Sequence, residues 1–130
     1  MNTVDRLREI SVIGIVSGVD NQGKHGPFGF VCTLPKHQGD VDELTFLVQF
    51  RKPTDKRYFR PMRPAWVEDE WPKKGGKVVC WNLTWANTGW RAGFVRNFRP
   101  GDDDVNERIK RNREVETEFR SSWNRRKKGR

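Results

Sequence analysis

The chain has 130 residues, of which 34% are hydrophobic and 33% are charged, and its formal net charge is +9 at pH 7. This length suggests one domain with an appendage, and the low apolar share implies that part of the chain is a solvated arm or a face for a partner. The charge favours polyanionic partners, with nucleic acid first and an anionic membrane surface second, while the lack of any run of roughly 20 apolar residues argues against a membrane span.

The N-terminal segment, residues 1–10, has no apolar stretch of the secretory-signal type, and we expect either a short helical turn or a frayed end there. Cys32 and Cys80 are too few and too far apart in sequence to indicate a disulfide framework or a metal knuckle. We therefore expect reduced thiols, a cytoplasmic location, and no metal or other cofactor.

Three β-strands are predicted in the first half of the chain. Residues 10–19 are dense in β-branched side chains, and Gly14 and Gly18 within them indicate a bulge or a bend. Residues 28–34 form the second strand and residues 44–50 the third, because apolar residues alternate there with other types. The polar stretches between these strands are predicted loops.

The stretch 51–74 differs from the strands around it. Its four prolines break any regular element, and basic residues are interleaved with aromatic ones. A connection of this length in a compact domain is usually functional or disordered, and the aromatic residues argue against full disorder. We interpret it as an insertion whose arginines contact phosphates, with a solvated face as the alternative.

Residues 77–85 and 90–98 form the fourth and fifth strands, joined by a hairpin turn in which Gly89 supplies a positive φ. Five strands, mostly short loops and glycines at the bends predict a mainly β fold, a small closed barrel over residues 11–100. The fourth strand is expected to place Val79, Trp81 and Leu83 on one face, with Trp81 buried in the core.

The C-terminal part, residues 101–130, is predicted to be a helix and a basic tail. Asp102, Asp103 and Asp104 open the helix, because acidic residues cap free amides and favour the positive end of the helix dipole. A metal cluster for phosphodiester cleavage is the alternative for these aspartates, and the helix cap explains them better. The helix runs to about Trp123, and a tail without acidic residues follows.

Phe28 and Phe30 share one face of the second strand, while Gly29 and Val31 alternate with them. Two phenylalanine rings on one face are either part of the core or an exposed platform for nucleobases, each of which stacks on an aromatic ring with roughly 1–3 kcal/mol. The residues of this strand alone leave both interpretations open.

Two runs and a spaced set of residues follow one another along the chain. The runs are Gly26-Pro27-Phe28-Gly29-Phe30-Val31 and Phe46-Leu47-Val48-Gln49-Phe50, and the spaced set is Gly76, Val79, Trp81, Leu83, Gly89, Ala92 and Val95. From Gly14 to about Val95 the chain resembles a cold-shock domain, which is a five-stranded oligonucleotide-binding barrel (OB-fold). The two runs correspond to the two ribonucleoprotein motifs of that family.

The resemblance implies a nucleic-acid site on the barrel, in which Phe28, Phe30 and Phe50 stack bases. Two platform positions of the family, a tryptophan and a histidine, are occupied here by Gly18 and Gln49. Residues beside the last hairpin and in the basic insertion are expected to compensate in part. The candidate binding residues are Lys24, His25, Phe28, Phe30, Gln49, Phe50, Arg51, Lys56, Arg57, Tyr58, Arg60, Trp90, Arg91, Arg125, Arg126, Lys127 and Lys128.

The residues and the resemblance leave three functions open. The first is a binding module for single-stranded RNA, with single-stranded DNA as a second ligand, acting as an RNA chaperone or a regulator of translation. The second is a structural subunit that docks RNA or protein in a larger ribonucleoprotein, such as a ribosome-like particle. The third, a small nuclease, has the least support, because no nucleophile–base pair, phosphate-cradling loop or metal-ligand spacing is evident. We therefore expect a protein that is not an enzyme.

Overall fold

The structure is a computed structural model that describes residues 10–21, 26–34, 43–49, 63–86 and 89–128, with side chains of the last stretch described as far as Trp123. The chain divides into two compact units, Met1–Phe98 and Arg99–Arg130. Each unit is described by itself below.

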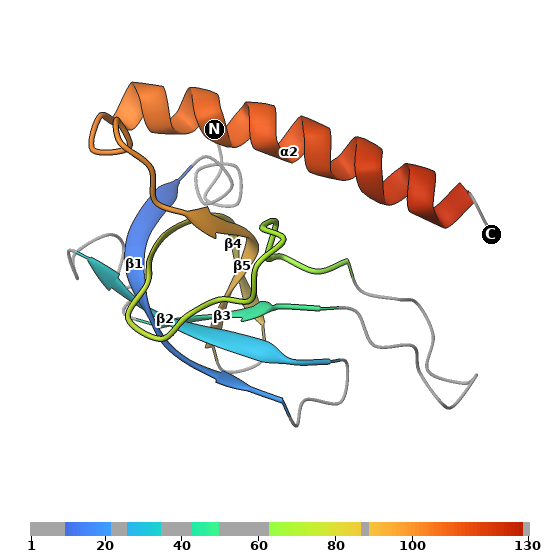
Figure 1. Cartoon of the computed structure of the whole chain (residues 1–130). Coiled ribbons are helices and arrows are strands. Elements are labelled where there is room, and N and C mark those ends of the chain that lie inside the picture. Colours follow the sequence, from blue (N-terminus) through green and yellow to red (C-terminus); the bar gives the residue numbers. More distant parts are fainter. Residues whose placement is uncertain (1–9, 22–25, 35–42, 50–62, 87–88, 129–130) are drawn as a thin grey trace. The chain divides into compact units, whose positions relative to one another are not determined.

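The first unit is a five-stranded sheet that closes on itself in a ring (Figure 1). Its strands are β1 (Ser11–Asp20), β2 (Phe28–Leu34), β3 (Glu43–Leu47), β4 (Lys77–Ala86) and β5 (Gly89–Asn97). They follow one another around the ring in the order β1-β2-β3-β5-β4, and β4 pairs with β1 to close it. The pairing of β3 with β5 is parallel and the other pairings are antiparallel. The prediction of a mainly β fold followed by a helix is confirmed.

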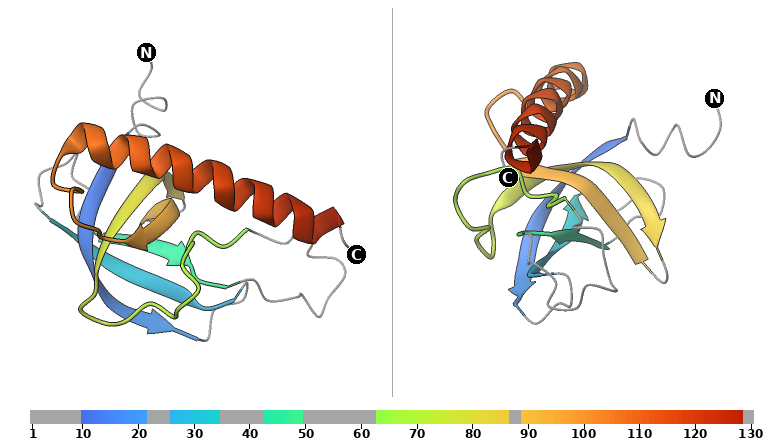
Figure 2. Two further views of the ribbon diagram at one scale, coloured as in Figure 1. Left: turned by 45° about the horizontal axis from the view of Figure 1, so that its top comes forward. Right: turned by 90° about the vertical axis from the view of Figure 1, so that its right-hand side faces the viewer.

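The hydrophobic core fills the inside of this ring. Figure 2 shows the ribbon of the ring from two further directions. Alternate residues of each strand point inward, as the period of two in a β-strand requires. The burial of this apolar surface is the main favourable term in the folding of the sheet. The cluster consists of Val12, Val16, Val31, Leu44, Phe46, Val48, Ala65, Trp66, Val78, Cys80, Leu83, Ala92 and Val95.

The two glycines of β1 have different structural roles. The register of β1 against β2 shifts between Val16 and Gly18, which confirms the predicted bulge. At Gly14, an added Cβ would lie 2.3 Å from Cγ1 of Val31, so β2 packs closely against the backbone there. At Gly18, nothing lies within 4 Å of an added Cβ. Close packing therefore requires glycine at position 14 and leaves space at position 18.

In both strands of the β4–β5 hairpin, the regular alternation of core-facing and outward-facing residues is interrupted at one point. This point is Asn82 in β4 and Gly93 in β5. Asn82 has a φ of 56°, and an added Cβ at Gly93 would lie 2.9 Å from Cβ of Asn82. Cys80 and Leu83, on either side of Asn82, both belong to the core. Strict alternation between these two positions is therefore broken by a left-handed residue that sequence periodicity does not reveal.

Because of this interruption, the side chains of β4 are not distributed over its two faces as predicted. Val79 and Trp81 are buried, as expected for Trp81, but they alternate with the core residues Val78 and Cys80 and lie on the opposite face. On that face the Trp81 ring stacks on Phe94, with ring centroids 5.1 Å apart. The prediction that Val79, Trp81 and Leu83 share one face is therefore wrong.

Part of the predicted insertion is an integral piece of the ring. Trp66 forms an isolated parallel bridge with Val95. Its ring packs on that of Phe46 within the core, with ring centroids 5.9 Å apart. The N–H of Ala65 donates to the carbonyl of Leu47 at 2.8 Å, and the N–H of Val67 donates to the carbonyl of Val95 at 3.0 Å. The prediction that prolines leave this stretch without a regular element agrees with its described part, residues 63–74, yet residues 65–67 still join β3 to β5.

The second unit contains one helix, α2 (Val105–Lys128), which starts later and ends later than predicted. Its N-cap is Asp104, whose Oδ1 accepts the N–H of Glu107 at 3.0 Å. The residues predicted as a basic tail, 125–128, form the last turn of the helix. Cations at a helix C-terminus interact favourably with the negative end of its dipole, which explains the extension.

Asp102 supports the start of α2 without belonging to it. Its buried carboxylate accepts the N–H of Arg99 at 2.7 Å through Oδ2 and forms an ion pair with Arg111 at 3.1 Å through Oδ1. Its carbonyl accepts a hydrogen bond from Arg108 at 2.8 Å. The interpretation of the aspartates as a helix-start structure is confirmed for Asp102 and Asp104.

We predict that Gly29→Ala destabilises the closed sheet by about 1–3 kcal/mol, because the new Cβ would lie 2.3 Å from Cζ of Phe46 and overpack the core. Gly18→Ala is the matched control and leaves the stability unchanged or slightly raised, since its Cβ meets nothing within 4 Å. Urea unfolding of both variants measures the two free energies. Equal midpoints would contradict the packing described here.

We predict that Asp104→Ala lowers stability by about 1 kcal/mol, because the N–H of Glu107 loses its capping acceptor. The exposed neighbour Asp103 provides the control, and Asp103→Ala changes stability by less than about 0.5 kcal/mol. Thermal unfolding followed by far-ultraviolet circular dichroism compares the two variants. A larger loss of stability in Asp103→Ala than in Asp104→Ala would show that Asp104 is not the N-cap.

Candidate nucleic-acid interface

The candidate interface is built on the outer side of β2. Phe28 and Phe30 are half-buried, whereas Gly29 and Val31 between and after them are buried. Val31 belongs to the core, and an added Cβ at Gly29 would collide with the Phe46 ring. Because side chains alternate along a strand, the two phenylalanine rings point away from the core.

The neighbouring strands extend this surface sideways. Phe30 pairs with Gly18 of β1 on one side and with Thr45 of β3 on the other. Thr45 in turn pairs with Arg91 of β5. We call Phe28, Phe30, Gly18, Thr45 and Arg91 the aromatic face.

Open space beside Phe30 distinguishes the aromatic face from an ordinary sheet surface. Gly18 contributes no side chain, and nothing lies within 4 Å of the position where its Cβ would be. The edge of the Phe30 ring on the β1 side is therefore not covered by a side chain from the paired residue. The bulge just before Gly18 also brings Ser17 alongside, where its hydroxyl donates to the carbonyl of Phe30 at 3.2 Å.

Arg91 supplies a positive charge to the aromatic face. Its guanidinium carbon lies 5.7 Å from the centroid of the Phe28 ring, within the range of a cation–π contact. The guanidinium group has five N–H donors in a planar fork that matches the geometry of a phosphate. It can therefore hold a phosphate next to a base that stacks on Phe28.

Two acidic residues lie on the same outer side of the sheet as the rings, one on each neighbouring strand. Asp20 pairs with Phe28 and is exposed, and Glu43 pairs with Cys32 and is exposed. These carboxylates oppose phosphate on the β1 side and at the far end of β2. The charge distribution therefore favours flat, neutral bases over the rings and phosphates near Arg91 on the β5 side.

Trp90, a predicted binding residue, lies apart from the aromatic face. It is half-buried and packs against the core, alternating with Arg91 along β5. Its ring meets that of Trp85 edge-on, with centroids 5.3 Å apart and an interplanar angle of 77°. The structure thus brings together Phe28, Phe30 and Arg91 but does not include Trp90 among them.

The remaining predicted residues are only partly described. Gln49 is exposed just beyond the end of β3, which stops at Leu47 instead of the predicted residue 50. For residues 125–128 the structure gives the helical backbone alone. The predicted residues that lie outside the described part of the chain are Lys24, His25, Phe50, Arg51, Lys56, Arg57, Tyr58 and Arg60.

The sequence analysis did not predict that Thr45 and the open position at Gly18 contribute to the aromatic face. Thr45 alternates with Leu44 and Phe46, so its outward direction could have been read from the period of the third strand. Its place between Phe30 and Arg91 could not, because it depends on the parallel pairing of β3 with β5.

Metal-ligand clusters, the buried thiol and membrane-spanning helices can each be assessed for the described residues. No group of three or more His, Cys, Asp or Glu side chains is close enough together within the described part of the chain to hold a metal ion. Burial raises the pKa of the Cys80 thiol, which therefore stays protonated and inert in the core. Among the described residues, no helix has both the length and the apolar character needed to span a membrane.

Comparisons of this chain with protein-family models, curated proteins and solved structures gave no match.

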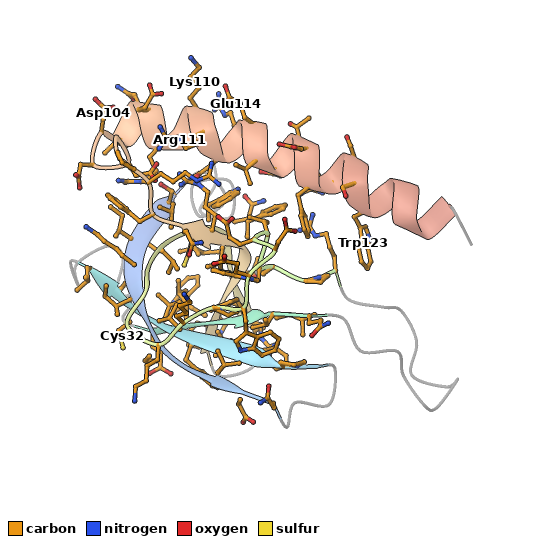
Figure 3. All side chains as sticks on the ribbon, viewed as in Figure 1. Cys32, Asp104, Lys110, Arg111, Glu114 and Trp123 are labelled. Atoms are coloured by element: carbon orange, nitrogen blue, oxygen red, sulfur yellow. The ribbon has the colours of Figure 1, made fainter. Side chains whose placement is uncertain are left out.

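We predict that only Cys32 reacts with iodoacetamide in the folded protein. Cys32 is exposed on the outer side of β2, where Figure 3 labels it, whereas Cys80 is buried and its thiol pKa is raised. Mass spectrometry should find one modified cysteine under native conditions and two in denaturant, and Cys32→Ser should abolish the native reaction. Rapid native labelling of Cys80 would contradict its position in the core.

Proposed function

We propose that this protein binds single-stranded nucleic acid, RNA first, through the aromatic face of a cold-shock-like OB barrel. The observation that carries the proposal is the outward direction of the Phe28 and Phe30 rings, with glycine and valine alternating towards the core. The strand order β1-β2-β3-β5-β4 supports it, because a small ring of five strands with a ligand face on its middle strands is how OB-folds bind oligonucleotides.

Stacking is the proposed source of base binding. An unpaired base has a flat π-face, and its contact with an aromatic ring contributes roughly 1–3 kcal/mol with little dependence on sequence. The half-buried state of the two rings suits this role, since β2 fixes their positions before the ligand arrives and little side-chain entropy is lost on binding. Paired bases cannot offer this face, so the proposed ligand is single-stranded.

Phosphate contacts are the proposed source of long-range attraction. Arg91 lies close enough to Phe28 to contact the backbone of the nucleotide stacked there, and the formal net charge of +9 raises the local concentration of a polyanion. The affinity should therefore fall as salt rises, by about 0.7 in logarithmic slope for each phosphate neutralised on a single strand. We propose a non-catalytic task, such as keeping RNA unpaired or regulating its translation.

The preference for RNA follows the family resemblance, and the fold departs from that resemblance at β4. Val79 and Trp81 belong to the spaced set of residues that carries the resemblance, yet they lie on the face opposite the core residues of that strand. This difference concerns the far part of the sheet and leaves the aromatic face unchanged, because β2 and β3 keep regular alternation.

We predict that Phe28→Leu and Phe30→Leu each weaken binding of an octamer of uridines by about 5- to 150-fold, because leucine keeps apolar bulk but removes the π-face. Fluorescence anisotropy at low salt measures the dissociation constants, and a DNA octamer of matching sequence tests the preference for RNA.

Arg91→Gln should weaken binding and reduce the salt slope by about 0.7.

Phe98→Leu is the matched control for these variants. Phe98 is also a half-buried ring, with Nζ of Lys77 located 4.1 Å from its centroid, but it lies just beyond the end of β5, outside the aromatic face. Its replacement should leave the affinity unchanged. Absence of binding by the unaltered protein at low salt would reject the function, and unchanged binding after both phenylalanine replacements would reject the face.

A further inference from the structure

The β1 side of the aromatic face combines an open position with a carboxylate. Gly18 pairs with Phe30, whereas Asp20 pairs with Phe28 and is exposed. Val19 between them packs against the core, so the outer side of β1 presents first Gly18 and then Asp20. The proposed function assigns no ligand group to this carboxylate, whose negative charge repels phosphate.

The space at Gly18 admits a base that is larger than the Phe30 ring. Nothing lies within 4 Å of the position where a Cβ of Gly18 would be. A base stacked on Phe30 can therefore extend across Gly18 towards Asp20, because diagonal neighbours of a strand pair lie about 7–8 Å apart. A purine, which has two fused rings, covers this span better than a pyrimidine, which has one.

The charges on the two sides of the rings determine the orientation of such a base. Arg91 lies on the β5 side, with its guanidinium carbon 5.7 Å from the centroid of the Phe28 ring, and attracts phosphate. In a purine nucleotide, the sugar is attached at N9, at the opposite end of the base from the Watson–Crick edge. A phosphate near Arg91 therefore directs the Watson–Crick edge towards β1 and Asp20.

The carboxylate of Asp20 determines which base fits this arrangement. An ionised carboxylate only accepts hydrogen bonds, and its roughly four acceptor sites suffice both for contacts within the protein and for two donors of a ligand. Guanine presents two adjacent donors on its Watson–Crick edge, N1–H and the 2-amino group. Adenine and cytosine present an amino group beside an acceptor nitrogen, and uracil presents N3–H between two carbonyls.

We propose that the aromatic face selects guanine, which stacks on Phe30 while Asp20 accepts hydrogen bonds from N1–H and the 2-amino group. This proposal rests on the proposed function and adds a base preference to it. Stacking alone is tolerant of sequence, so the preference comes from the carboxylate. A bidentate contact of this kind discriminates against a wrong base by about 5- to 150-fold.

The test uses a uridine octamer in which one central uridine is replaced by guanosine, inosine or adenosine. Fluorescence anisotropy at low salt should show that the guanosine octamer binds about 5- to 150-fold more tightly than the adenosine octamer. Inosine keeps N1–H but lacks the 2-amino group, so its octamer should have an intermediate affinity. Asp20→Asn replaces one acceptor oxygen by a donor and should reduce the preference for guanosine to less than about twofold.

Glu43→Gln is the matched control for Asp20→Asn. It removes the same charge on the opposite side of β2, where Glu43 pairs with Cys32, and should keep the full preference for guanosine. Gly18→Val fills the open position, so it should also reduce the preference, because the base can no longer extend across β1. Circular dichroism confirms that each variant is folded.

The outcomes separate this proposal from the one on which it depends. If Phe28→Leu weakens binding of the uridine octamer but guanosine is preferred no more than adenosine, the guanine site is wrong and the proposed function stands. A preference for guanosine that persists in Asp20→Asn, or that is lost equally in Glu43→Gln, also overturns the guanine site. If the unaltered protein binds none of the octamers at low salt, both proposals fail together.

Discussion

The packing of the Phe46 ring against the backbone of Gly29 is the contact on which the rest of the first unit depends. With no side chain at position 29, β2 lies directly on the core, and an added Cβ would be only 2.3 Å from Phe46. This close approach fixes which side of β2 faces inward. Phe28 and Phe30 are outward because Gly29 is inward, so the core contact and the candidate ligand face are two sides of one arrangement.

Local sequence patterns predicted much of the fold. The second strand is found at the predicted residues, and the glycines of the first strand mark a bulge, because alternation and glycine placement are local properties. Tertiary geometry limited the rest. The change of face at Asn82 needs a left-handed residue within a strand, and Trp66 enters the core through contacts with residues far from it in sequence.

In the candidate site, too, local sequence patterns predicted some features, whereas others depend on tertiary geometry. The direction of Phe28 and Phe30 could be inferred from the residues between them, whereas the placing of Arg91 beside Phe28 depends on β3 and β5 running parallel. The ring of Trp90 and its place near a hairpin predict a binding residue, but its position in the alternation directs it to the core, and its cross-strand partner Trp85 is the exposed one of the pair. An aromatic residue in a hairpin therefore needs its cross-strand partner before its role can be assigned.

The hydrogen bond from Ala65 to Leu47 has a consequence for how this chain tolerates change. Strand β3 ends at Leu47, and the chain returns to the carbonyl of this residue at Ala65. Lengthening such an excursion adds only about 0.6 kcal/mol of closure entropy for each doubling. One carbonyl therefore holds the two ends of this connection together, so the ring closes in the same way whatever the length of chain that lies between them.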